Sequence, residues 1–243
     1  MADLTPRQIN ILKHLVEEFI ETAQPVGSEV MEKKFNLGIC PATIRNEMSR
    51  LAQMGYIKKQ HSSSGRVPTS MGLKFYVKQL MEPEKLSVSE EIGIKDKLWE
   101  HRSNFDKMLG QATKELAKRT KCWSVSATQQ GGFFSSGVAN LLDEPEFFDI
   151  DVTRTTLSLM DQVDFWNKVM EDTFHAVGNE EFHVLIGSEM GAEYLEPCGL
   201  TYQDYEIGPN KGIIGILGPA RQSYSEVVPL INYFARIITE IGS

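Results

Sequence analysis

The chain has 243 residues, of which 25 are basic and 33 acidic, and its formal net charge is −8. Hydrophobic residues make up 41% of the chain, which is too many for a chain disordered throughout. No run of 18 or more apolar residues occurs, so the sequence excludes a membrane-spanning helix. The first residues show neither the basic nor the apolar stretch of a secretory signal, and we therefore expect a cytoplasmic protein.

The charge is unevenly distributed along the chain. Residues 1–80 contain 11 basic and 7 acidic side chains, whereas the remainder contains 14 and 26. Within residues 41–80 seven basic side chains face one carboxylate, that of Glu47. A basic segment attached to an acidic body favours an anionic partner for the first part of the chain alone.

Three short helices are predicted within the first 55 residues. The first has Thr5 as its N-cap and Pro6 at its first position, and Ser28 caps a second helix that ends near Lys34. A third helix begins at Pro41 and ends near Met54. Helical spacing assigns the inward face of this third helix to Ile44, Met48 and Leu51.

A small basic hairpin is predicted next, with strands at 56–60 and 66–68 and a polar turn between them. Three helices followed by such a hairpin indicate a winged helix-turn-helix, whose third helix enters the DNA major groove. Arg45 is suited to guanine and Asn46 to adenine, while cations on the hairpin suit phosphates. The full predicted DNA-binding set is Ser28, Pro41, Ala42, Thr43, Arg45, Asn46, Ser49, Arg50, Lys58, Lys59, His61, Ser62, Ser63, Ser64, Gly65 and Arg66.

Seven strings follow one another in order along the chain: Leu4–Gln8, Gln24–Ser28, Ala42–Met48, Ser63–Thr69, Gly72–Val77, Asn140–Phe147 and Gly212–Arg221. Together they resemble the HrcA family of bacterial heat-inducible transcription repressors. This resemblance implies a winged-helix repressor that binds, as a homodimer, an inverted-repeat operator of the CIRCE type upstream of chaperone genes. It also implies that a chaperonin helps to keep the repressor active and that heat releases it. We expect no cofactor and no metal.

The sequence predicts three parts: a first domain at 1–82, a bridging helix at 83–122, and a second domain at 123–243. The bridging helix either forms a dimeric coiled coil or, as we favour, packs on its own second domain. Strands are expected at 182–187, 200–207 and 213–217, with a loop at 129–137 and helices at 151–177 and at the C-terminus. These elements predict an α+β fold, which the family resemblance identifies as a GAF-like domain.

One departure from the family pattern is apparent. Family members carry a long segment before the Asn140–Phe147 string, and only residues 123–136 stand in its place here. The resemblance therefore implies a shortened repressor with a trimmed GAF-like domain. The bridging and C-terminal helices are our candidates for its dimer interface.

The sequence predicts no catalytic or metal site. None of the common hydrolase, metalloprotease or phosphate-loop motifs occurs, and the three separated cysteines form no Cys-x-x-Cys pair. Glu181 and His183 lie two apart, as surface pairs often do, and the glycines at 212, 215 and 218 lack the dinucleotide-binding spacing. Cys40 precedes the third helix, where a redox switch is conceivable but a small buried residue is favoured.

Two alternatives to the repressor stay open at this point. The GAF-like domain would make the chain a ligand-sensing transcription regulator with a different operator. A nucleic-acid adaptor without sequence preference would show steep salt dependence and no operator discrimination.

Overall fold

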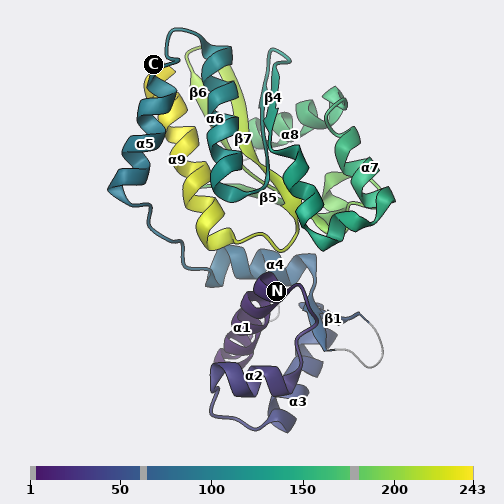
Figure 1. Ribbon diagram of the computed structural model, residues 1–243. Helices are drawn as coiled ribbons and strands as arrows, with labels where there is room; N and C mark the ends of the chain where they lie inside the picture. Colours follow the sequence, from purple (N-terminus) through teal and green to yellow (C-terminus); the bar gives the residue numbers. More distant parts are fainter. Residues whose placement is uncertain (1–3, 61–64, 176–180, 243) are drawn as a thin grey trace. The chain divides into compact units, whose positions relative to one another are not determined.

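The computed structural model describes residues 4–60, 65–175 and 181–242 and contains both helices and a sheet, as the α+β prediction requires (Figure 1). Its contacts divide the chain into two units. The first comprises the residues up to Glu82 with Arg221–Tyr224, and the second comprises Pro83–Ala220 with Ser225–Ser243. Residues 83–122, predicted as a bridging helix, therefore fall within the second unit.

The first unit begins with three helices, α1 (Pro6–Thr22), α2 (Ser28–Phe35) and α3 (Pro41–Gln53). The predicted start of α1 is confirmed, because the side chains of Thr5 and Gln8 form a reciprocal capping box. The predicted cap of α2 is wrong by one residue: Gly27 is the N-cap, and Ser28 is a buried residue of the first turn. Ser28 therefore packs within the first unit and does not cap the helix.

A two-stranded antiparallel hairpin follows, formed by β1 (Ile57–Lys59) and β2 (Arg66–Pro68), with Lys59 opposite Arg66. This is the order of elements predicted for a winged helix-turn-helix. The chain then continues through α4 (Ser70–Phe75) and a π-helical turn, η1 (Tyr76–Leu80). The predicted inward face of α3 is confirmed, since its three apolar members are at most 4% exposed: Ile44, Met48 and Leu51.

The second unit is built on a five-stranded antiparallel sheet with the order β4-β3-β7-β6-β5. The predicted strands near 183, 200 and 213 are confirmed, and β6 and β7 pair along ten residues each. The predicted loop at 129–137 is too long, because its second half forms the edge strand β4. The strands are β3 (Trp123–Thr128), β4 (Phe133–Ser136), β5 (His183–Ile186), β6 (Cys198–Ile207) and β7 (Asn210–Pro219).

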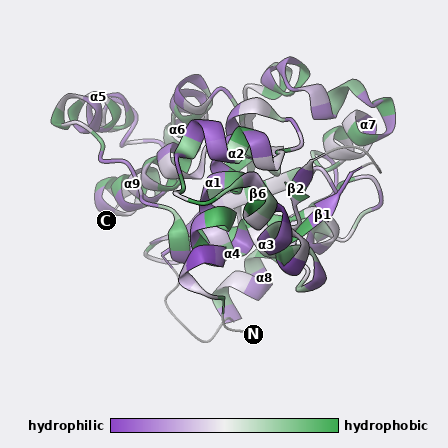
Figure 2. Cartoon of the chain, turned by 90° about the horizontal axis from the view of Figure 1, so that it is seen from below, coloured by the Kyte–Doolittle hydropathy of each residue, from purple (hydrophilic) through white to green (hydrophobic). Residues whose placement is uncertain are grey.

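Each face of this sheet contributes to its own hydrophobic core. One core gathers residues of α5 (Val88–Trp99), α6 (Phe105–Thr120) and α9 (Tyr224–Gly242) around Ile214 and Ile216 of β7. The other core gathers residues of the second unit's other helices, whose bounds are given below, around Trp123 and Leu200 of the sheet. Figure 2 shows hydrophilic and hydrophobic residues together on these helices, as amphipathic helices require. The remaining helices are η2 (Val138–Asp143), η3 (Pro145–Phe148), α7 (Ile150–Ser158), α8 (Val163–His175) and η4 (Gly187–Met190).

Two long helices predicted from the sequence are each broken in two. Residues 100–104 separate α5 from α6, where the Asn104 side chain accepts a hydrogen bond from the Lys107 amide and so starts a new helix. Residues 159–162 separate α7 from α8, where Trp166 Nε1 donates to the Leu159 carbonyl at 2.7 Å. Since α6 buries its apolar stripe in the second unit's core, packing on its own domain is confirmed over the coiled coil.

The C-terminal helix α9 is confirmed, including its inward apolar face. Pro229 lies within it and has no amide proton to donate to the Ser225 carbonyl. That carbonyl instead accepts a 2.8 Å hydrogen bond from the Glu84 amide, so the helix continues through the proline. Among the helices of the described residues, none is both long and apolar enough to cross a membrane.

Candidate nucleic-acid interface

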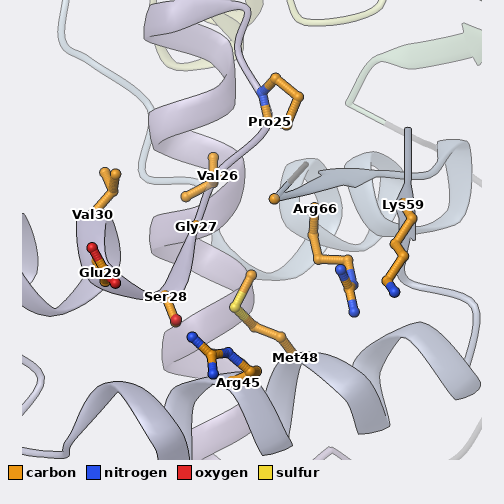
Figure 3. Close-up of a pocket in the computed structure, with 11 residues that line it drawn as sticks. Pro25, Val26, Gly27, Ser28, Glu29, Val30, Arg45, Met48, Lys59 and Arg66 are labelled. Carbon is orange, nitrogen blue, oxygen red and sulfur yellow. The ribbon is translucent and has the colours of Figure 1, made fainter. Parts of the chain in front are cut away.

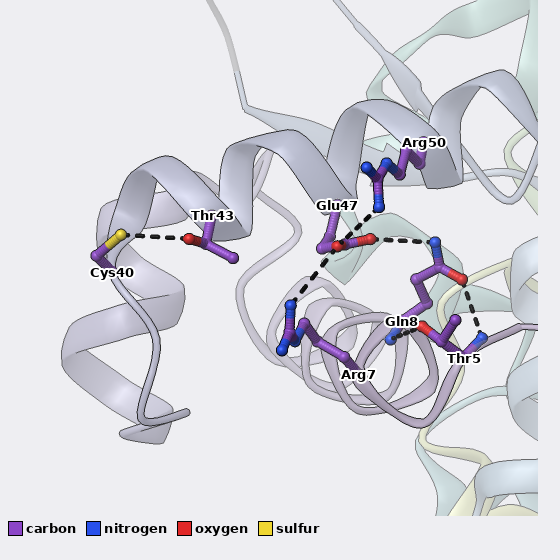
Figure 4. A network of polar contacts seen from close by, with 7 residues as sticks. All are labelled: Thr5, Arg7, Gln8, Cys40, Thr43, Glu47 and Arg50. Carbon is purple, nitrogen blue, oxygen red and sulfur yellow. Dashed lines mark hydrogen bonds and ion pairs between the residues drawn. The ribbon is translucent and has the colours of Figure 1, made fainter.

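The orientation of α3 is fixed by a buried hydrogen bond to α1. Gln8 Oε1 accepts from the Thr5 amide in the capping box, and Gln8 Nε2 donates to Glu47 Oε2 at 3.1 Å (Figure 4). Both side chains are nearly inaccessible, with Gln8 6% and Glu47 7% exposed. One glutamine thus joins the start of α1 to the middle of α3, and a charge-assisted hydrogen bond of this kind is stronger than a neutral one.

Two arginines complete this network. Arg50 Nη1 lies 3.2 Å from Glu47 Oε1, and Arg7 Nη1 lies 3.9 Å from the same oxygen. Both arginine side chains are more than half exposed, so their charges remain available to solvent. Glu47, the lone carboxylate of residues 41–80, therefore links α3, to which it belongs, to α1. Arg50, predicted to assist base contacts, is engaged with it.

The N-terminal half of α3 carries the leading base-contact candidates on its surface. Arg45 and Asn46 are exposed, as predicted for side chains that enter a major groove. Ser49 donates to the Arg45 carbonyl at 2.9 Å, and Thr43 Oγ1 lies 3.3 Å from Cys40 Sγ. Cys40 is exposed, so the prediction of a buried residue is wrong; the Thr43 hydroxyl lowers the pKa of this thiol.

An open groove of about 510 Å³ separates α3 from the hairpin (Figure 3). Arg45 and Met48 reach it from α3, while Lys59 and Arg66 extend side by side from the hairpin. Among the described residues that line it, three are cationic and Glu29 is the only carboxylate. A groove with this balance is electropositive and suits an anion. The other lining residues are Pro25, Val26, Gly27, Ser28, Val30 and Gly65.

The hairpin is attached to the loop before α2 by backbone contacts. Val26 and Arg66 form an isolated antiparallel bridge, with mutual hydrogen bonds of 2.8 and 2.9 Å. Gly65 was predicted to permit the turn, but its structural requirement is close approach. A Cβ added there would lie 2.4 Å from the carbonyl carbon and oxygen of Val26.

The bridge brings the Arg66 side chain into the groove. Its Nε atom is buried and has no hydrogen-bond partner among the described residues. Leaving a buried donor without a hydrogen bond costs free energy. The Arg66 guanidinium is therefore well suited to donate to an added acceptor, such as a phosphate oxygen.

Some residues of the predicted DNA-binding set line this groove, and others lie outside it. The groove brings together Ser28, Arg45, Lys59, Gly65 and Arg66. The members that do not line it are Pro41, Ala42, Thr43, Asn46, Ser49, Arg50 and Lys58. The hairpin-turn residues His61, Ser62, Ser63 and Ser64 lie outside the described residues. The set as a whole stays a prediction.

Sequence reasoning missed the residues that hold this surface in place. Gln8, Glu47 and Val26 carry the contacts that orient α3 and the hairpin. The single carboxylate in residues 41–80 was a usable signal, since an isolated acid among seven basic residues needs a structural explanation. No local pattern indicated that Val26 pairs with the hairpin, because its partner Arg66 lies forty positions away.

The features of the second unit that were considered as enzyme or ligand sites have structural explanations. His183 Nε2 lies 3.8 Å from Asp204 Oδ1 and stacks on Tyr202. Gly212 and Gly215 allow close strand packing, because an added Cβ would meet a neighbouring carbonyl oxygen at 2.5 or 2.3 Å. Among the described residues no group of three or more His, Cys, Asp or Glu side chains is arranged to hold a metal ion.

Comparisons with known proteins identify the family. The family model described as "HrcA protein C terminal domain" matches residues 77–228, which is more than half of the chain. The heat-inducible transcription repressor HrcA of Carboxydothermus hydrogenoformans is 25% identical, and the alignment covers 97% of each chain. That alignment runs over 337 positions, more than the 243 residues here, so the relative has residues without a counterpart, as expected for a shortened chain.

Among solved structures, the crystal structure of a hypothetical protein at 2.2 Å resolution matches with a TM-score of 0.76 and 19% identity. It covers 98% of both chains, so the fold is shared. An IclR family transcriptional regulator from Brucella abortus has a TM-score of 0.29, which is too low to argue from. The family match and the curated relative confirm the resemblance predicted from the sequence: the chain belongs to the HrcA family of heat-inducible transcription repressors, which are not enzymes.

Proposed function

We propose that this repressor binds double-stranded DNA through its first unit, as a winged helix-turn-helix, and so controls heat-shock genes in the cytoplasm. Helix α3 enters the major groove with Arg45 and Asn46 toward the base edges. The hairpin follows the sugar-phosphate backbone beside it. The observation that carries this proposal is the groove in which Arg45, Lys59 and Arg66 converge from separate elements.

We further propose that this groove receives a backbone phosphate. Arg66 Nε is the one donor of the three cations that is both buried and unpartnered within the described chain, and phosphate oxygens are strong acceptors. Arg45 and Lys59 add positive charge on the two sides of the groove. Such contacts set the register of the protein on DNA, while base-edge contacts from α3 supply sequence preference.

The operator is proposed to be an inverted repeat bound by a homodimer. Two copies related by a two-fold axis present two α3 helices to two half-sites, so the symmetry of the site mirrors that of the protein. The family resemblance supports this arrangement, as it supports a chaperonin partner that keeps the repressor active until heat releases it.

The test is fluorescence anisotropy on three labelled duplexes at one stated salt concentration: a CIRCE-type inverted repeat, a single half-site, and a shuffled sequence. A specific dimeric repressor prefers the full repeat over the shuffled duplex by about three orders of magnitude or more. Binding the half-site as tightly as the repeat would contradict the dimer. Equal weak binding to all three would contradict this operator.

The chaperonin partnership is tested separately. The repressor is heated mildly, purified chaperonin is added, and operator binding is measured by anisotropy. Recovery of operator binding with the chaperonin, but not with serum albumin, is expected. The same recovery with both proteins would contradict a specific partnership.

A further inference from the structure

Helix α3 exposes a broad arc of its surface between two packed borders. At the hairpin border Met48 lines the groove described above, and at the α1 border Glu47 accepts the buried hydrogen bond from Gln8. Successive residues of an α-helix lie about 100° apart around its axis, which fixes their order across the arc. From the hairpin border to the α1 border, the exposed side chains of residues 42–50 are Arg45, Ala42, Asn46 and Arg50.

Two guanidinium groups converge on one carboxylate oxygen at the α1 border (Figure 4). Arg50 Nη1, from α3, lies 3.2 Å from Glu47 Oε1, and Arg7 Nη1, from α1, lies 3.9 Å from the same atom. The second oxygen of Glu47 accepts from Gln8 Nε2. Within this group of three charged side chains, one positive charge is therefore left uncompensated.

The two arginines retain donors for a further partner. Their side chains are 56% exposed at Arg7 and 65% exposed at Arg50, whereas that of Glu47 is 9% exposed. A guanidinium carries five N–H donors in a fixed plane, more than one shared oxygen can accept. The carboxylate beneath them also restrains both side chains, which reduces the rotamer entropy lost when an anion binds. Such a pair is suited to the oxygens of a phosphate group.

The position of the pair indicates which phosphates it can reach. The major groove is about 12 Å wide, close to the diameter of a helix with its side chains, so a helix seated there has a sugar-phosphate backbone on each side. Lys59 and Arg66 lie beyond the hairpin border of α3. Arg7 and Arg50 lie at the other border. Each side of the exposed arc is thus supplied with cations.

We propose that Arg7 and Arg50 form a second phosphate-binding site, which contacts the DNA strand opposite to the one contacted by the hairpin. Arg7 is not among the residues predicted from the sequence to bind DNA. Arg50 then contacts the backbone and not the bases. This inference rests on the proposed DNA binding and extends it, because it assigns the two borders of α3 to the two strands of one half-site.

The test is fluorescence anisotropy of the full chain on a CIRCE-type duplex and on duplexes that each carry one uncharged methylphosphonate linkage. On the unmodified duplex Arg7→Gln should weaken binding about tenfold and reduce the slope of log affinity against log salt by about one. At the phosphate that Arg7 contacts, the uncharged linkage should weaken binding of the parent but not of Arg7→Gln. The same comparison with Lys59→Ala should locate its phosphate on the other strand of that half-site.

Two further variants separate a phosphate contact from other effects. Lys114→Gln removes an exposed positive charge from α6 in the second unit and should leave the affinity unchanged. Arg7→Lys keeps the charge and should keep the salt slope of the parent.

Three results would overturn this inference while leaving the proposed function intact. The parent binds the operator but Arg7→Gln binds it equally well; or Arg7→Gln loses the same factor on every modified duplex, as a structural effect would; or the phosphates coupled to Arg7 and to Lys59 lie on one strand. A parent that binds none of the duplexes would overturn both the inference and the proposed function.

Discussion

Replacing Glu47 with alanine should loosen the attachment of helix α3 to α1 without removing any residue proposed to touch DNA. The substitution removes the acceptor for Gln8 Nε2, which lies 3.1 Å away and is buried. It also removes the partner of the Arg50 guanidinium at 3.2 Å. The Gln8 amide would then be left with an unsatisfied buried donor.

The size of the effect follows from these contacts. A hydrogen bond to a charged group contributes about 1.5–3 kcal/mol, and leaving its buried donor unpaired accounts for much of that loss. The ion pairs with Arg7 and Arg50 are exposed to water on the arginine side, so together they add at most about 1 kcal/mol. We expect Glu47→Ala to destabilise the first unit by about 2–4 kcal/mol.

The assay is native-state hydrogen exchange of the α1 and α3 amides, because a chain of two units need not unfold in a single step. Protection of these amides should fall by the stated free energy while that of β6 and β7 stays constant. Glu32→Ala, at an exposed position of α2, is the matched control. A change in α3 protection below about 0.5 kcal/mol would refute the reasoning, since surface substitutions alone produce that much.

Three further predictions concern the proposed DNA-binding surface. Asn46→Ala should relax base preference at one or two positions of each half-site and cost about 1–3 kcal/mol there; an equal loss on every duplex would remove it from the base contacts. Lys59→Ala should weaken binding to all sequences alike and reduce the slope of log affinity against log salt by about one, and an unchanged slope would contradict a phosphate contact. Gly65→Ala should break the Val26–Arg66 bridge, because its Cβ would overlap the Val26 carbonyl, and destabilise the unit by about 1–3 kcal/mol. Retained exchange protection of the Val26 amide would refute this.

The shortened form of the chain bears on how two copies would pair. The curated relative aligns over more positions than this chain has, although nearly all of this chain is matched. Residues 83–122, predicted as one candidate interface, bury the apolar stripe of α6 in their own unit. An interface on this segment would have to use the outer face of α5, where Val88, Ile92 and Trp99 are exposed. Sedimentation of the parent and of Ile92→Asp would test this: a shift to monomer supports it, and an unchanged dimer contradicts it.

Local sequence determined the elements whose signals lie within one or two turns. The capping box joins Thr5 to Gln8, three positions apart, and the start of α3 at Pro41 is an equally local signal. Such signals depend on neighbouring backbone groups and side-chain periodicity, which a sequence displays directly. The family strings added the functional class, because their residues could be matched in order.

Tertiary structure alone decided how these elements become a surface. The Gln8–Glu47 hydrogen bond joins residues 39 apart, and the Val26–Arg66 bridge joins the loop before α2 to the hairpin. The break between α7 and α8 coincides with a hydrogen bond from the Trp166 indole, which no propensity predicts. Burial and hydrogen-bond satisfaction depend on which distant segments meet, and local spacing carries no record of that.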